Sequence, residues 1–373
     1  MEIKVSDILT GILSLLVVFT LMSMSMNSMI IKPRLYDGTV NELGRYSFTF
    51  DAYEHIKSNS ENPVIALGSS KMREIFDGHL IGEITEYNGD FYNLAYAGDR
   101  PYVRMIEIDA LIDTNPKLVI IEIGPNVFSS LSNPVPESTA NRMTQLMALN
   151  TAWQESSWHK MLTSEDKVIL PESRLEQLEY FSTISSKSID STIGYSLGLQ
   201  EPPYSCDAEW GSVRCVPVPN NPEYSDYVKY PIQFRNSLKA IKEGNAKWTL
   251  EEFYGERLDN YLAGSYHNPE GHLNKNQLAF EFIIESLVDN DIPVMLVNLP
   301  YNPVLIDRLS DGQWDYLNSS MERYSETLNV RIVDFMWSNN LIDDDFNDFT
   351  HAARTGELKF AEFIAPEIDN YMT

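Results

Sequence analysis

The sequence predicts an α/β protein in which an open parallel sheet is covered by helices on both faces. Short apolar runs alternate with stretches of helical periodicity from Pro63 onward, which is typical of strand–helix–strand units. This alternation stops between residues 129 and 272 and then resumes. An uncharged apolar stretch precedes it near the N-terminus. These three observations predict a sheet domain, a largely helical or irregular insertion within it, and an N-terminal transmembrane helix.

The N-terminal stretch spans residues 8–31, which contain no Asp, Glu, Lys or Arg. A helix rises about 1.5 Å per residue, so this length is enough to cross a hydrocarbon core of about 30 Å. A cleaved signal peptide is the alternative, because the small residues of SMSMNS suit a signal peptidase. We expect an uncleaved anchor, since the stretch is long for the apolar part of a signal peptide. The flanking Lys4, Lys32 and Arg34 do not fix its orientation.

The charge balance excludes one class of partner. The chain has 54 acidic and 28 basic side chains and a formal net charge of −26. Nucleic-acid binding requires a basic surface that neutralises phosphates, so no nucleic-acid partner is expected. With 43% hydrophobic residues the composition is that of a folded, globular protein.

The two cysteines indicate the compartment. Cys206 and Cys215 stand close together in a segment rich in Pro, Gly and Ser. In a membrane-anchored chain, two thiols at this spacing favour a disulfide formed under oxidising conditions. A metal site would need further His or Cys nearby, and none is present there. We therefore expect a Cys206–Cys215 disulfide, no metal, and the body of the protein outside the cytoplasm.

The strands and helices of the sheet domain are assigned from their periodicity. Strands are expected at 63–70, 90–98, 116–126, 292–300 and 330–335. Helices are expected at 49–58, 100–115, 275–290, 312–328 and 355–368. The chain then divides into a short tail (1–7), an anchor (8–31), a juxtamembrane connector (32–60), a first sheet part (61–128), the insertion or cap (129–272) and a second sheet part (273–373).

Residues able to do chemistry follow several of these strands. Parallel strands end at a common edge of the sheet, where open α/β proteins bind their ligands. We therefore expect these side chains and turns to converge on one rim: Gly68, Ser69, Ser70, Gly98, Asn126, Asp348 and His351.

Four motifs resemble, in order, those of the SGNH (GDSL-like) hydrolases and acyltransferases. They are ALGSSKM, NLAYAG, IGPN and DFTHAARTG, and the resemblance covers residues 62–126 and about 275–370. The Gly-Ser-Ser form and the N-terminal anchor look most like the membrane-anchored, extracytoplasmic glycan O-acyltransferase branch, which includes the D-alanyl transfer protein. The resemblance implies a flavodoxin-like three-layer α/β/α sandwich and no cofactor.

The resemblance also implies roles for individual residues. Ser70 would be the nucleophile, His351 its general base, and Asp348 the acid that orients the imidazole. The oxyanion hole would consist of the backbone N–H groups of Ser70 and Gly98 and the side-chain amide of Asn126. The structural alternative is that these residues only cap helices and shape turns, as serine commonly does before a helix.

This sequence departs from the family pattern in two places. Ser69 stands where Gly-Asp-Ser has an aspartate, and Val127 stands where the third motif often has a second acid. Four aspartates lie before His351, and Asp348 is chosen among them by its spacing alone.

We thus expect an extracytoplasmic serine acyltransferase that moves an acyl group, with acetyl favoured, to a cell-surface or secreted glycan through acyl-Ser70. A membrane-bound O-acyltransferase would be the partner that supplies the acyl group, because acyl-CoA is absent outside the cell. The alternatives are a secreted carbohydrate esterase or deacetylase, and a non-catalytic glycan-binding or assembly protein that retains the fold. The expected location is the cell membrane, with a single pass.

Overall fold

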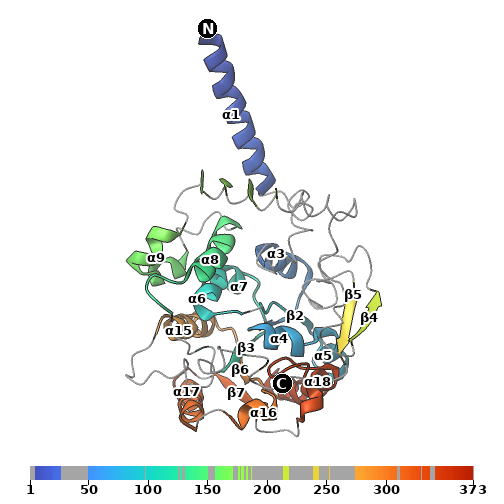
Figure 1. The fold of residues 1–373 in the computed structure, drawn as a ribbon. Helices are drawn as coiled ribbons and strands as arrows, with labels where there is room; N and C mark the ends of the chain where they lie inside the picture. Colours follow the sequence, from blue (N-terminus) through green and yellow to red (C-terminus); the bar gives the residue numbers. More distant parts are fainter. Residues whose placement is uncertain are drawn as a thin grey trace.

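The fold is described from a computed structural model (Figure 1). The residues that the structure describes are 5–26, 49–96, 98–124, 127, 131–149, 156–170, 175–176, 178–179, 182–183, 186, 213–217, 238–242, 252, 274–308, 311–328, 330–336 and 341–372.

A five-stranded parallel sheet forms the centre of the molecule. Its strands are β1 (Pro63–Leu67), β2 (Asp90–Asn93), β3 (Leu118–Ile123), β6 (Val294–Asn298) and β7 (Arg331–Asp334). They lie in the order β2-β1-β3-β6-β7, and every neighbouring pair is parallel. Renumbered within the sheet, this is the 2-1-3-4-5 order of flavodoxin-like proteins. The predicted fold class and all five predicted strands are confirmed.

The central strands are buried along their whole length. Every residue of β1, β3 and β6 is buried, which explains why these segments are mostly apolar and do not alternate between apolar and polar residues. Alternate side chains point to opposite faces, so each strand supplies two separate cores. Ile65 and Val119 belong to one core, whereas Val64 and Ile120 belong to the other.

Helices cover both faces and complete the three layers (Figure 1). One core is closed by α3 (Thr49–Asn59), α6 (Pro101–Arg104), η2 (Met105–Glu107), α7 (Ile108–Asp113), α15 (Lys275–Val288) and α17 (Asp311–Leu328). The other core is closed by α4 (Ser70–Ile75), α5 (Gly78–Ile84) and α18 (Arg354–Met372). A further short helix, α16 (Pro303–Ile306), follows β6. The helix expected at 100–115 is therefore present as α6, η2 and α7, with one 3₁₀ turn in its middle.

The described parts of the insertion contain both helices and strands. They are α8 (Glu137–Leu149), η5 (Ser157–Met161), α9 (Ser164–Ile169) and an antiparallel pair, β4 (Val213–Pro217) with β5 (Leu238–Lys242). Met143, Leu146 and Trp158 are fully buried in the first core, so α8 and η5 pack on the sheet domain. The β4–β5 pair was not predicted. Cys206 lies outside the described residues, so the disulfide stays a prediction.

The N-terminal helix α1 spans Val5–Met26 and projects from the rest of the molecule in Figure 1. Its segment Val5–Met24 has a mean hydropathy of 2.1, and it is long and apolar enough to cross a membrane. A signal sequence has the same length and composition, so both expectations for this segment remain in place.

Helix α18 offers a direct measure of how much the second core contributes to stability. Ile364 is fully buried, whereas Leu358 on the same helix is 39% exposed. Replacing Ile364 by Ala should lower the free energy of unfolding by about 2–5 kcal/mol, because lost burial and a residual cavity add. Leu358→Ala should change it by less than about 0.5 kcal/mol. Chemical denaturation of both variants tests this; equal losses would contradict the described packing.

Candidate active site

The segment that follows β1 is a tight strand-to-helix turn. Ser69 is the N-cap of α4, and its side-chain oxygen accepts a hydrogen bond from the backbone N–H of Lys71 at 3.2 Å. Ser70 is the first residue of α4, where backbone N–H groups have no partner within the helix. The capping interpretation of the sequence thus applies to Ser69, and Ser70 is left free for another task.

The loop before α18 holds a buried aspartate and a histidine. Asp348 is only 3% exposed, and its Oδ1 accepts from the backbone N–H groups of Thr350 and His351, both at 2.8 Å. Its Oδ2 lies 2.7 Å from Nδ1 of His351. Both the position and the orientation of the imidazole are therefore set by one carboxylate.

The neighbouring acids have other partners. Asp345 forms an ion pair with Lys359 at 2.6 Å, and Asp343 accepts from the Asn302 amide at 2.5 Å. Asp344 is exposed. Of the four aspartates, Asp348 is the one that the structure brings to His351.

Ser70 and His351 meet across the edge of the sheet. Nε2 of His351 lies 2.8 Å from Oγ of Ser70, although the two residues are 281 positions apart. Together with the Asp348 contact this gives a continuous chain of hydrogen bonds from carboxylate to imidazole to hydroxyl. Such a chain allows the imidazole to take the serine proton while the carboxylate stabilises the resulting imidazolium.

The environment tunes both titrating groups toward these roles. Burial alone would raise the pKa of Asp348, but hydrogen bonds from His351 and from two backbone amides hold that pKa below its ordinary value. Burial alone would lower the pKa of His351. The carboxylates of Glu74 and Asp348 outweigh burial and the opposing charge of Arg73, so the pKa of His351 is raised.

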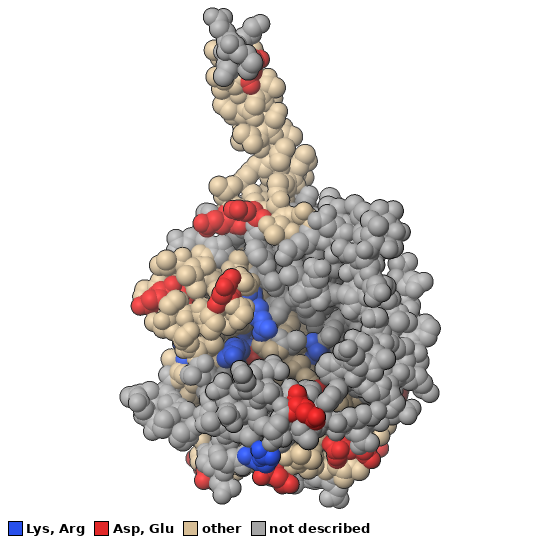
Figure 2. All heavy atoms as spheres, in the orientation of Figure 1, with Lys and Arg blue, Asp and Glu red and all other residues tan. Residues whose placement is uncertain are grey.

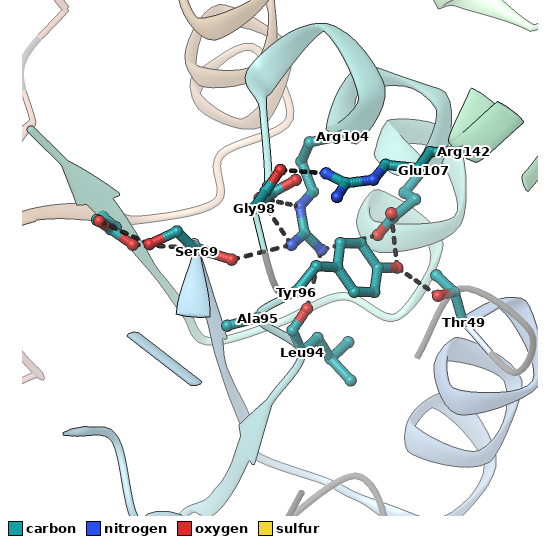
Figure 3. Close-up of polar contacts among 12 residues, drawn as sticks. Thr49, Ser69, Leu94, Ala95, Tyr96, Gly98, Arg104, Glu107 and Arg142 are labelled. Atoms are coloured by element: carbon teal, nitrogen blue, oxygen red, sulfur yellow. Dashed lines mark hydrogen bonds and ion pairs between the residues drawn. The ribbon is translucent and has the colours of Figure 1, made fainter. Parts of the chain in front are cut away.

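Gly98 lies in a left-handed conformation, with φ of +61°. Its carbonyl accepts a hydrogen bond from the Arg142 guanidinium, which comes from α8 in the insertion (Figure 3). A Cβ at this position would lie 3.1 Å from Nη1 of Arg142, so both the backbone angle and the space favour glycine. Asn126, the third expected oxyanion donor, lies outside the described residues.

Arg104 joins the first and second motifs (Figure 3). Its guanidinium donates to the carbonyl of Gly68 at 3.4 Å and to that of Leu94 at 2.9 Å. It also forms ion pairs with Asp99 at 2.8 Å and with Glu107 at 3.1 Å. Burial raises the pKa of Asp99 to about 6, although Arg104 opposes the shift.

Two further polar contacts complete this support. Glu107 accepts from the hydroxyl groups of Tyr53 at 2.8 Å and Tyr96 at 2.7 Å. No sequence motif pointed to Arg104 or Glu107. A usable signal was present, because two opposite charges three residues apart occur in the otherwise apolar stretch YVRMIEI.

Asn93 at the end of β2 holds the far end of α4. It is fully buried, and its Nδ2 donates to the carbonyl of Phe76 at 2.8 Å and, at longer range, to those of Met72 and Arg73. Its Oδ1 accepts from the backbone N–H of Ala95 at 3.0 Å. The asparagine of NLAYAG therefore ties the second motif to the helix that begins with Ser70.

The described charged side chains are unevenly spread over the face drawn in Figure 2. Figure 2 shows a hollow on the face over α4 and α6, with Lys and Arg side chains at its edge. On this face the described Asp and Glu side chains lie mostly away from the hollow. Within the described ranges, no group of three or more His, Cys, Asp or Glu is arranged to hold a metal ion.

Comparison with known proteins gives similarities of fold at low identity. No protein-family model matches the chain, and no curated protein matches it. A putative acylhydrolase from Bacteroides fragilis is similar with 11% identity and a TM-score of 0.36, over 84% of this chain and 89% of that one. A GDSL-like lipase from Bacteroides thetaiotaomicron is similar with 10% identity and a TM-score of 0.37, over 87% of this chain and 99% of that one.

The protonation state of His351 should control the reactivity of Ser70 at low pH. A general base works only when it is neutral, so the rate of Ser70 labelling by a fluorophosphonate should fall about tenfold per pH unit below the pKa of His351. Because that pKa is raised, the fall should begin above the ordinary value of 6.5. A labelling rate that stays constant down to pH 5 would contradict the assignment of His351 as base.

Glu74 provides a second check on the same titration. Its carboxylate raises the pKa of His351, so Glu74→Gln should move the acid limb of the labelling profile to lower pH. Glu83 pairs with His79 on the exposed face of α5, and Glu83→Gln is the matched control that should leave the limb in place. A Glu74→Gln profile that coincides with the wild-type profile would show that Glu74 does not act on His351.

Proposed function

We propose that this protein is a serine-dependent acyl-transfer enzyme of the SGNH type that works through an acyl-Ser70 intermediate. One observation carries the proposal: Ser70, His351 and Asp348 form a hydrogen-bonded chain with distances of 2.8 and 2.7 Å at the carboxyl edge of a parallel sheet. The nucleophile, base and orienting acid come from distant segments, so simple helix capping does not account for their meeting. An intact chain of this kind also disfavours a purely non-catalytic role.

The first half-reaction forms the acyl-enzyme. Oγ of Ser70 bonds to the acyl carbon of an ester while Nε2 of His351 takes the hydroxyl proton. The bond from the acyl carbon to the leaving alcohol then breaks, and His351 returns the proton to that alcohol. Asp348 stabilises the imidazolium between these two proton transfers, in line with the lowered pKa of its carboxyl.

The second half-reaction releases the acyl group to a hydroxyl. His351 removes the proton of the acceptor hydroxyl, whose oxygen bonds to the acyl carbon, and Ser70 Oγ leaves and regains a proton. In both halves a negative charge develops on the acyl oxygen. We assign its stabilisation to the N–H groups of Ser70 and Gly98 and to the Asn126 amide, each worth about 3 kcal/mol in comparable enzymes.

We propose that the acceptor is a glycan hydroxyl outside the cytoplasm and that the acyl group is acetyl. The apolar helix α1 supports a membrane anchor, and the expected Cys206–Cys215 disulfide supports an oxidising compartment. A membrane-bound O-acyltransferase is then the expected source of the acyl group. A carbohydrate esterase uses the same residues with water as acceptor, and the choice between them is one of acceptor only.

The nucleophile is tested by covalent labelling of the full chain. A fluorophosphonate should modify Ser70 in the folded protein, and Ser70→Ala should abolish the modification. Asp348→Asn should slow labelling by about 10³- to 10⁴-fold, because the imidazole loses the partner that sets its tautomer and stabilises its charge. Mass spectrometry of the labelled peptide identifies the modified serine.

Ser69→Ala serves as the control for the site of labelling, because it removes the adjacent hydroxyl and keeps the hydroxyl of Ser70. This variant should still be labelled at Ser70. If the wild-type protein is folded and takes no label, or if the label is found on Ser69, the proposed mechanism fails.

The acceptor is tested by following the fate of the acyl group. With an activated acetyl ester as donor, an acyltransferase should accumulate acetyl-Ser70 and turn over quickly only when an acceptor glycan is added. An esterase should release acetate at the same rate with or without the glycan. Rapid turnover without any glycan would contradict the proposal of a glycan acyltransferase. It would remain consistent with a serine esterase that uses the same residues.

A further inference from the structure

We propose that Glu122 is the positioning residue that holds Ser70 in place, because its carboxylate binds both neighbours of the nucleophile, Ser69 and Lys71. The inference rests on the proposed role of Ser70. Glu122 lies on the central strand β3, is 5% exposed, and points from the sheet toward the turn that follows β1. No motif of the sequence singled it out.

The first flank is Ser69. Its backbone N–H donates to Oε2 of Glu122 at 2.6 Å, and its hydroxyl donates to Oε1 at 3.1 Å. The side chain of Ser69 in Figure 3 lies on the side of the turn that faces this carboxylate. Charge-assisted hydrogen bonds of this length are about twice as strong as neutral ones, so the carboxylate fixes Ser69 through both its backbone and its side chain.

The second flank is Lys71. Its ammonium lies 3.4 Å from Oε1 of Glu122 and 3.8 Å from the centre of the Tyr301 ring, and its side chain is only 5% exposed. Burial lowers the pKa of Lys71, while the Glu122 carboxylate works against that shift. The same carboxylate oxygen therefore contacts the residue before and the residue after Ser70.

The space around the turn leaves little freedom for an alternative arrangement. A Cβ placed on Gly68 would lie 2.7 Å from Cβ and from Oε2 of Glu122, and also 2.7 Å from Cβ of Met72. The turn thus packs directly on the Glu122 side chain. With Ser69 and Lys71 both turned toward the sheet, the side chain of Ser70 between them is the one directed to His351.

The consequence for reactivity follows from geometry. A misplacement of about 1 Å at a reacting atom can cost about 100-fold in rate. Ser70 has no described side-chain contact of its own besides the one to His351, so its position depends on its neighbours. Glu122 therefore acts on the reaction through Ser69 and Lys71, without touching the substrate.

Glu122→Gln tests the proposal, because it keeps the shape of the side chain but removes the charge and replaces one acceptor by a donor. The expected result is a fall of about 10- to 100-fold in the rate of fluorophosphonate labelling of Ser70. The kcat for an activated acetyl ester should fall to a similar degree while its KM stays within twofold. Labelling as fast as that of the wild type, in a folded variant, overturns the proposal.

A second variant separates positioning from stability. Glu122→Gln leaves the Lys71 ammonium buried without its counter-charge, which by itself destabilises the fold. The double variant Glu122→Gln with Lys71→Met removes that charge, so its Tm should recover toward the wild-type value. Labelling of Ser70 should stay slow. If labelling recovers together with Tm, Glu122 serves stability alone and the proposal is overturned.

Asp166→Asn is the matched control. Asp166 is also a fully buried carboxylate paired with a lysine, at 2.7 Å from Lys275, and it makes no described contact with the turn around Ser70. This variant should lower Tm and leave the labelling rate of the folded protein within about twofold. A wild-type protein that takes no label would instead refute the proposed function, so the two failures are distinguishable.

Discussion

The hydrogen bond between Ser70 and His351 is the contact that places the strictest geometric demand on the rest of the structure. It joins residues 281 positions apart, and it forms only when the end of β1 and the loop before α18 meet at one edge of the sheet. A proton passes directly between the two atoms only within hydrogen-bond reach, about 2.6–3.2 Å. The buried strands, the two cores and the backbone hydrogen bonds to Asp348 together set the distance between Ser70 Oγ and His351 Nε2.

Charged groups buried at this edge supply the necessary rigidity. Glu122 and Arg104 are each about nine-tenths buried or more, and each binds backbone atoms of the turn at Gly68 and Ser69. Inside a protein such contacts are stronger than in water, and an unpaired charge is costly. A different conformation of the turn would break the hydrogen bonds of Glu122 or of Arg104. The turn is therefore held in one conformation, and we expect substitutions of either residue to be poorly tolerated.

The sequence was sufficient for the fold because the strands are buried on both faces and appear as largely apolar runs, as in VIAL and LVII. Short motifs in a fixed order also singled out Ser70, His351 and Asp348, and the structure brings these three residues together. The sequence did not identify Glu122, Arg104 or Arg142. Their roles come from contacts between different segments of the chain. The sequence around a single charged residue does not reveal which residue it will contact in the folded protein. The strands β4 and β5 were missed because their segment lacks a clear alternation of apolar and polar residues.

The order of the strands has a consequence for when Ser70 and His351 meet during synthesis. The loop with Asp348 and His351 follows β7, the edge strand that pairs with β6 only after the whole insertion has been made. Because synthesis runs from the N-terminus, β1, β2 and β3 are made well before the loop that holds Asp348 and His351. During that interval Ser70 has no imidazole beside it. The chain of hydrogen bonds through Ser70, His351 and Asp348 therefore forms only after the last segment of the sheet has docked.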